Sequence, residues 1–204
     1  MTSTTRPDPI DRLATAAIFL APLLIVASTI AYSLAGGMNR GEVGGALQVY
    51  AYGVFGIAVV GLVLPIRHRL PRTAAAALGL GLITAATGAS YGVDSMWAAI
   101  TGMPQLVDQG NDTVGFVAMA PPAATLVLTF IILGVAYART GLVPAPIGYL
   151  LAMVGPMFPA GRATNILPIA LATDVLLLIA LVAIGRALVA RQARETPARM
   201  STST

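Results

Sequence analysis

One aspartate inside an apolar run is the residue of this chain best placed to do chemistry. Asp174 lies within IALATDVLLLIALVAI, twelve positions from both Arg162 and Arg186. Twelve residues of α-helix rise about 18 Å, so if the two arginines mark opposite membrane interfaces, Asp174 lies near the midplane. An ionised carboxylate costs at least about 2.5 kcal/mol there, and desolvation favours its protonated form. We expect either a proton donor facing the bundle interior or an acid hydrogen-bonded to a neighbouring helix purely for packing.

A second candidate acid follows a pair of glycines. Gly88 and Gly92 form a Gly-xxx-Gly pair that allows another helix to pack closely. Ser90 and Tyr91 precede Asp94 by four and three residues and so share its helical face. Asp94 is therefore predicted either to line a site with Asp174 or to lie outside it.

Aromatic and polar side chains gather toward the same predicted side of the membrane. The ordinary interpretation is an interfacial belt of aromatic residues; the functional alternative is an aromatic wall for a cationic guest. Residues 95–113 carry apolar side chains at helical spacing and are predicted to form a short lid. The predicted substrate-binding residues are Gln48, Tyr50, Tyr52, Tyr91, Trp97 and Arg162.

The sequence lacks the residues and motifs that several classes of chemistry require. The chain has no cysteine, and its single histidine, His68, lies among arginines, so no metal or haem site is expected. A P-loop, a dinucleotide-binding glycine motif and a Ser/His/Asp set are also missing. We therefore expect no cofactor, no metal and no nucleic-acid partner.

Composition predicts the elements that must position these residues. Hydrophobic residues make up 57% of the 204 residues and charged residues only 10%, against roughly a quarter charged in soluble domains. Continuous apolar runs favour transmembrane helices over a barrel. The prediction is an all-α bundle in one domain, with tails at 1–12 and 186–204 and six spans: Leu13–Leu34, Gly44–Ile66, Thr73–Val93, Gly115–Ala138, Pro144–Ala160 and Ile166–Gly185.

Arginine placement predicts the orientation. Ten of the twelve arginines fall in the two tails and the even-numbered loops, and only Arg40 and Arg162 fall in the odd-numbered loops. Because cytoplasmic loops carry an excess of basic residues, both termini are predicted to be cytoplasmic, in a bacterial cell membrane. The anionic membrane surface is the expected partner of this charge.

Prolines fall at membrane depth in the fourth and fifth spans. Pro121 and Pro122 lie in one, and Pro156 and Pro159 lie near the end of the other. A proline removes a backbone donor and can kink a helix, so these helices are predicted to be kinked or broken. They are either purely structural or part of a cavity wall.

The small, histidine-poor and cysteine-free bundle with isolated acids resembles actinobacterial six-span membrane proteins. It is also similar in general architecture to the integral-membrane terpene cyclases of meroterpenoid and prenylated-indole pathways. That resemblance implies a metal-free enzyme in which an acid protonates an isoprenoid substrate and aromatic rings stabilise the cation. The alternatives are a proton-coupled transporter, although the two halves show no inverted repeat, and a non-catalytic membrane subunit. The oligomeric state is open.

Overall fold

The computed structural model describes residues 9–106 and 114–201, and over these ranges the chain forms helices and no strand, which confirms the all-α prediction. Every predicted span corresponds to a helix of the structure. In chain order the helices are α1 (Pro9–Leu34), α2 (Glu42–Val63), α3 (Pro71–Thr101), α4 (Val114–Thr140), α5 (Ala145–Ala163) and α6 (Leu167–Ser201).

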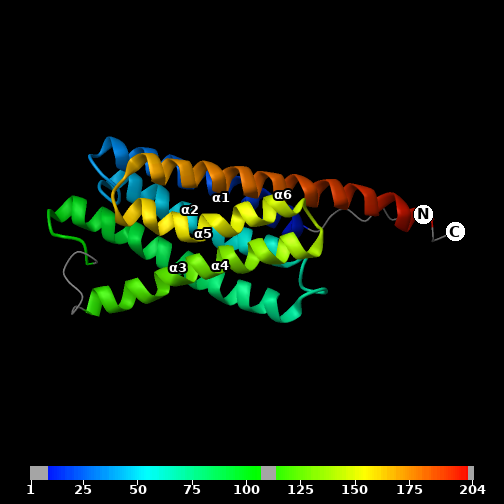
Figure 1. Ribbon diagram of the computed structural model, residues 1–204. Helices are drawn as coiled ribbons and strands as arrows, with labels where there is room; N and C mark the ends of the chain where they lie inside the picture. The colour runs from blue at the N-terminus through cyan, green and yellow to red at the C-terminus, as the bar shows by residue number, and fades with distance from the viewer. Residues whose placement is uncertain (1–8, 107–113, 202–204) are drawn as a thin grey trace.

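The helices form a ring in which each packs against the next along the chain. Successive helices run in opposite directions (Figure 1), and α6 packs back against α1, which closes the ring. The connections 35–41 and 164–166 and the segment 102–106 lie at one end, here called the pocket end. The connections 64–70 and 141–144 lie at the other, here called the arginine end, where the described chain also begins and finishes (Figure 1).

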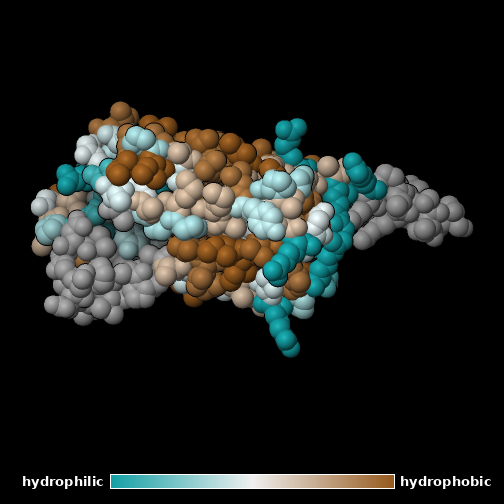
Figure 2. Space-filling view, in the orientation of Figure 1, coloured by the Kyte–Doolittle hydropathy of each residue, from teal (hydrophilic) through white to brown (hydrophobic). Residues whose placement is uncertain are grey.

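In the part of the chain that the structure describes, four helices are long and apolar enough to cross a membrane: Pro9–Leu34, Glu42–Val63, Pro71–Thr101 and the Leu167–Arg191 part of α6. Within α4, Ala124–Thr140 is a shorter apolar helix. Figure 2 shows apolar side chains along the middle of one face and hydrophilic ones gathered toward the arginine end. The chain is therefore a helical membrane protein.

The end of α3 differs from the prediction. The predicted span stops at Val93, whereas the helix continues to Thr101 and ends at Gly102, which has a left-handed φ of 70°. Residues 95–101 contain no helix-breaking residue, so the helix ends only where a glycine can adopt the left-handed conformation. A separate lid over 95–113 is thus wrong for 95–101, and 107–113 lie outside the described residues. The predicted tail after Gly185 is also helical, since α6 continues to Ser201.

The prolines do not interrupt their helices. Pro156 and Pro159 lie inside α5, which continues to Ala163 rather than ending at Ala160. The backbone of α4 is likewise helical from Val114 to Thr140, through positions 121 and 122. Each proline removes one backbone donor, and the helices continue on either side.

Glycines set the closest helix contacts. A Cβ on Gly92 would lie 2.6 Å from the carbonyl oxygen of Gly45, and one on Gly88 would lie 2.1 Å from the Tyr52 ring. The predicted packing face on α3 is therefore confirmed, with α2 as its partner. A similar pair joins α4 to α5, where a Cβ on Gly148 would lie 2.6 Å from the oxygen of Gly134.

The arginine half of the ring is filled by side chains. Leu62, Leu133, Leu181 and Ile184 are fully buried there. The hydroxyl of Tyr137 donates a hydrogen bond to the carbonyl oxygen of Leu62 at 2.8 Å, which satisfies a polar group inside this core. The large cavity of the structure is lined by none of these four residues.

Candidate functional site

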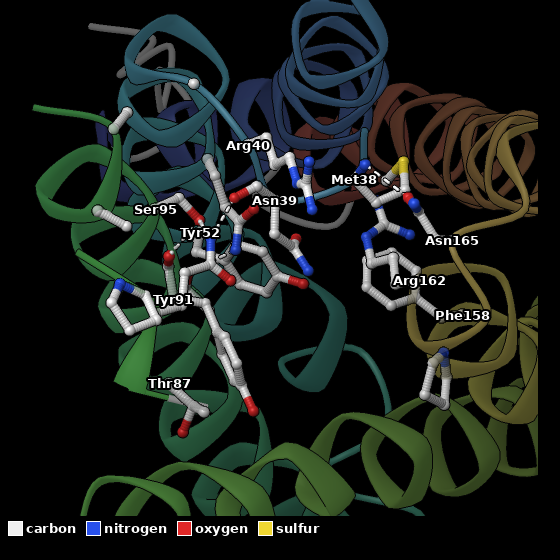
Figure 3. A pocket seen from close by; sticks show the side chains of 18 of the residues that line it. Met38, Asn39, Arg40, Tyr52, Thr87, Tyr91, Ser95, Phe158, Arg162 and Asn165 are labelled. Atoms are coloured by element: carbon white, nitrogen blue, oxygen red, sulfur yellow. Dashed lines mark hydrogen bonds between the residues drawn. The ribbon is translucent and has the colours of Figure 1, made fainter. Parts of the chain in front are cut away.

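A cavity of about 860 Å³ occupies the pocket end of the ring. Its walls come from α2, α3, α5, the 38–41 connection and residues 102–105 (Figure 3). Leu126 of α4 and Asn165 also line it. Helices α3 and α4 cross near their middle, where the hydroxyls of Thr84 and Thr125 are 2.9 Å apart, and they diverge on either side of the crossing (Figure 1).

Arg162 forms part of the cavity wall from the last turn of α5. Its guanidinium lies over the ring of Phe158, 3.6 Å from the centroid, one helical turn earlier (Figure 3). Its Nη2 donates to Oδ1 of Asp174 at 3.1 Å and to Oγ1 of Thr29 at 2.9 Å. Cation–π stacking and a charge-assisted hydrogen bond thus hold this side chain in one orientation.

Asp174 lies behind Arg162 and is fully buried. The hydroxyl of Thr29 donates to Oδ2 of Asp174 at 2.5 Å, so the cluster Thr29, Arg162 and Asp174 ties α1, α5 and α6 together. Buried carboxylates in membrane helices are commonly paired in this way. Asp174 is therefore not the isolated acid that was predicted, but one member of an ion pair.

The chain reverses between Arg162 and Asp174. α5 ends at Ala163 and α6 begins at Leu167, with Asn165 in a left-handed conformation (φ 56°) in the turn. The twelve residues therefore form a hairpin rather than one helix, and Arg162 contacts Asp174 directly. Asp174 is seven residues beyond Leu167, about 10 Å along α6.

The other predicted site residues divide into two groups. Gln48, Tyr52 and Tyr91 line the cavity with Arg162, and Gln48 Nε2 donates to the carbonyl oxygen of Gly88 at 2.9 Å. Tyr50 and Trp97 are 68% and 61% exposed and do not line it. Their outward position is that of an interfacial aromatic belt.

Asp94 has a different environment from Asp174. It is 7% exposed, does not line the cavity, and accepts a hydrogen bond from the backbone N–H of Leu106 at 3.0 Å. This contact holds the 102–106 segment against α3. The structure therefore does not bring Asp94 and Asp174 into one site.

Several cavity residues lie outside the predicted set of substrate-binding residues. Asn165 accepts a hydrogen bond from the backbone N–H of Met38 at 2.8 Å and so joins two connections of the pocket end. Asn39 and Arg40 come from the first of these connections and point into the cavity (Figure 3). Only Phe158 carried a usable signal, because its spacing of four from Arg162 places both on one helical face.

The cavity lining is rich in hydrogen-bond donors. Among the described residues that line it, Arg40 and Arg162 are the charged ones and no carboxylate is present. Nη1 of Arg162 is buried without a hydrogen-bond partner. No group of three or more His, Asp or Glu that could hold a metal occurs in the described part of the chain. Such a lining is suited to bind a ligand that carries acceptor oxygens.

Comparison with protein families, with characterised proteins and with solved structures finds no match.

Proposed function

We propose that the chain is a six-span protein of the bacterial cytoplasmic membrane with both termini in the cytoplasm. The antiparallel ring supports this proposal, because it places the exposed arginines Arg67, Arg69, Arg139 and Arg186 at one end. The cavity then opens toward the outer face.

The absence of cysteine makes this topology directly testable. Single cysteines at exposed His68 and exposed Thr164 sit at opposite ends of the ring. In intact cells a membrane-impermeant maleimide is expected to label Thr164→Cys at once and His68→Cys only after permeabilisation. The reverse pattern contradicts the orientation, and labelling of both in intact cells contradicts an odd number of spans between them.

We further propose that the protein binds a lipophilic small molecule in the cavity. The observation that carries this proposal is a cavity of about 860 Å³ inside a membrane bundle, lined by both apolar and polar side chains. Ligand sites typically have volumes of about 300–1,000 Å³ and this kind of lining. Leu126, Ala98, Ala99 and Pro159 supply apolar surface for a hydrocarbon chain.

Protection of an introduced cysteine tests this proposal. Thr87 is a half-buried residue of the cavity wall, so Thr87→Cys is expected to react with a maleimide and to be protected by oleyl alcohol. A second change, Leu126→Trp, fills part of the cavity and is expected to abolish the protection. His68→Cys serves as the control for non-specific effects of the alcohol on the micelle. Equal protection of Thr87→Cys and His68→Cys contradicts binding in the cavity.

Acid-initiated cyclisation of an isoprenoid is a second proposal for the same cavity. Tyr52, Tyr91 and Phe158 line it and present rings that favour a cation. Asp174 would deliver the proton, although Arg162 stands between its carboxylate and the cavity. Purified protein and its Asp174→Asn variant are assayed on linear prenylated substrates and for proton-coupled flux. Conversion by the wild type that is lost in the variant supports the cyclase. Flux without conversion supports a transporter. The absence of both conversion and flux contradicts both proposals.

A further inference from the structure

We infer that the cavity selects lipophilic molecules whose head group is an oxyanion, a carboxylate or a phosphate, and that Arg162 is the residue that holds it. The inference rests on the proposed binding of a lipophilic molecule and adds the chemistry of its head group. It predicts that an anionic lipophilic molecule binds more tightly than the neutral molecule with the same hydrocarbon chain.

The first argument is the unused half of the Arg162 guanidinium. Nη2 makes all the bonds to Asp174 and Thr29, and Nη1 is buried without a partner. Leaving a buried charged donor unsatisfied costs free energy, and an acceptor oxygen removes that cost. Arginine presents several N–H groups in a fork that matches carboxylate and phosphate oxygens. Because Arg162 lines the cavity, its unpaired N–H group favours a ligand that carries an acceptor oxygen, and most favourably an anionic one.

The second argument is the charge of the lining. Asp174 balances Arg162, and Arg40 adds a second cation with no carboxylate among the described lining residues. Figure 3 shows Arg40 and Asn39 reaching into the cavity from the connection that Met38 joins to Asn165. A head group near the two arginines meets donors from both. A cationic head group would gain no carboxylate partner from the described lining residues.

The third argument is preorganisation. Phe158 supports the face of the guanidinium, while Asp174 and Thr29 fix its edge. The side chain therefore loses little conformational freedom when a ligand binds, which favours affinity. Asp174 is in this account a positioning residue that does not touch the ligand.

Matched ligand pairs in the Thr87→Cys protection assay test the inference. Oleate is compared with oleyl alcohol, and farnesyl phosphate with farnesol, so each pair differs only in the head group and the two pairs separate carboxylate from phosphate. Because removal of Arg162 alone leaves Asp174 buried and unpaired, the test variant is the charge-neutral double change Arg162→Gln with Asp174→Asn. Arg139→Gln, at the exposed arginine end, is the matched control.

We expect at least one anion to protect at about tenfold lower concentration than its alcohol, the effect of one hydrogen bond to a charged group. The double variant is expected to lose this preference and still bind the alcohol, and Arg139→Gln is expected to keep it. Equal protection by both members of both pairs overturns the inference and leaves the proposed binding intact. A preference that persists in the double variant overturns the role of Arg162, and protection by none of the four contradicts the proposed function itself.

Discussion

The two ends of this bundle treat polar residues in opposite ways. At the arginine end, exposed arginines surround a filled core in which Tyr137 bonds to Leu62. At the pocket end, Arg162 turns inward, pairs with a fully buried Asp174 and borders a cavity. The same residue type is thus exposed at one end and forms part of a cavity wall at the other.

The buried ion pair at the pocket end is not needed for stability alone. Replacing a buried ion pair by apolar residues is often neutral or stabilising, so packing alone does not require Arg162 and Asp174. The arginine half achieves a closed core without any buried charge among its described residues. A pair that also leaves a guanidinium nitrogen without a hydrogen-bond partner, on a side chain that lines a cavity, is better explained by binding.

The largest expected effect is the loss of one member of the pair. Arg162→Gln leaves the Asp174 carboxylate buried without its cation, and we expect a loss of about 3–5 kcal/mol in the free energy of unfolding. The double change Arg162→Gln with Asp174→Asn is expected to recover most of that loss. Chemical denaturation in detergent micelles measures both, and additive effects of the two single changes would show that the pair is not coupled.

The second largest effect is expected where α4 and α5 pack closely in the arginine half. A Cβ on Gly148 would lie 2.5 Å from the backbone nitrogen of Ala138, so Gly148→Val forces α4 and α5 apart. We expect a loss of about 1–3 kcal/mol or more in the free energy of unfolding. Gly79, whose Cβ would meet nothing within 4 Å, is the matched position, and Gly79→Val is expected to be nearly neutral. Thermal unfolding compares the two, and similar shifts would contradict the packing account.

A larger side chain is expected to have different effects on stability in the filled half and in the half that contains the cavity. Leu133 is fully buried and Leu126 lines the cavity. Leu133→Trp is expected to destabilise by about 1–3 kcal/mol through overpacking, whereas Leu126→Trp extends into free space and costs less. Equal losses on denaturation would mean that the cavity does not accept the larger side chain.

The smallest effects concern single hydrogen bonds. Tyr137→Phe removes the bond to Leu62 and is expected to cost about 1 kcal/mol. Asp94→Asn keeps an acceptor oxygen for the Leu106 N–H and is expected to cost less. Denaturation curves of the two variants check this order, and a larger loss for Asp94→Asn would assign that acid a role beyond holding the 102–106 segment.

The sequence predicts helices well and the site only in part. Apolar runs and the Gly88/Gly92 pair report local length and contact, so the helix positions and a close-packing face on α3 could be predicted, whereas its partner α2 could not. Asp174 stood out by its unfavourable surroundings, but its partner could not be assigned, because a turn of three residues at 164–166 replaces helix by a hairpin. Thr29, Asn39 and Asn165 reach the site through tertiary packing that no spacing along the chain records.

Photocrosslinking tests the central claim, that the hollow end binds a lipophilic molecule, most directly. Purified protein is irradiated with a diazirine-bearing oleyl alcohol analogue, and the adducts are mapped by mass spectrometry with excess oleyl alcohol as competitor. The account predicts competed adducts on cavity residues such as Thr87, Tyr91 and Leu126, which disappear in Leu126→Trp. Adducts confined to outward-facing residues such as Leu82 and Ile83, and insensitive to competitor, would contradict it.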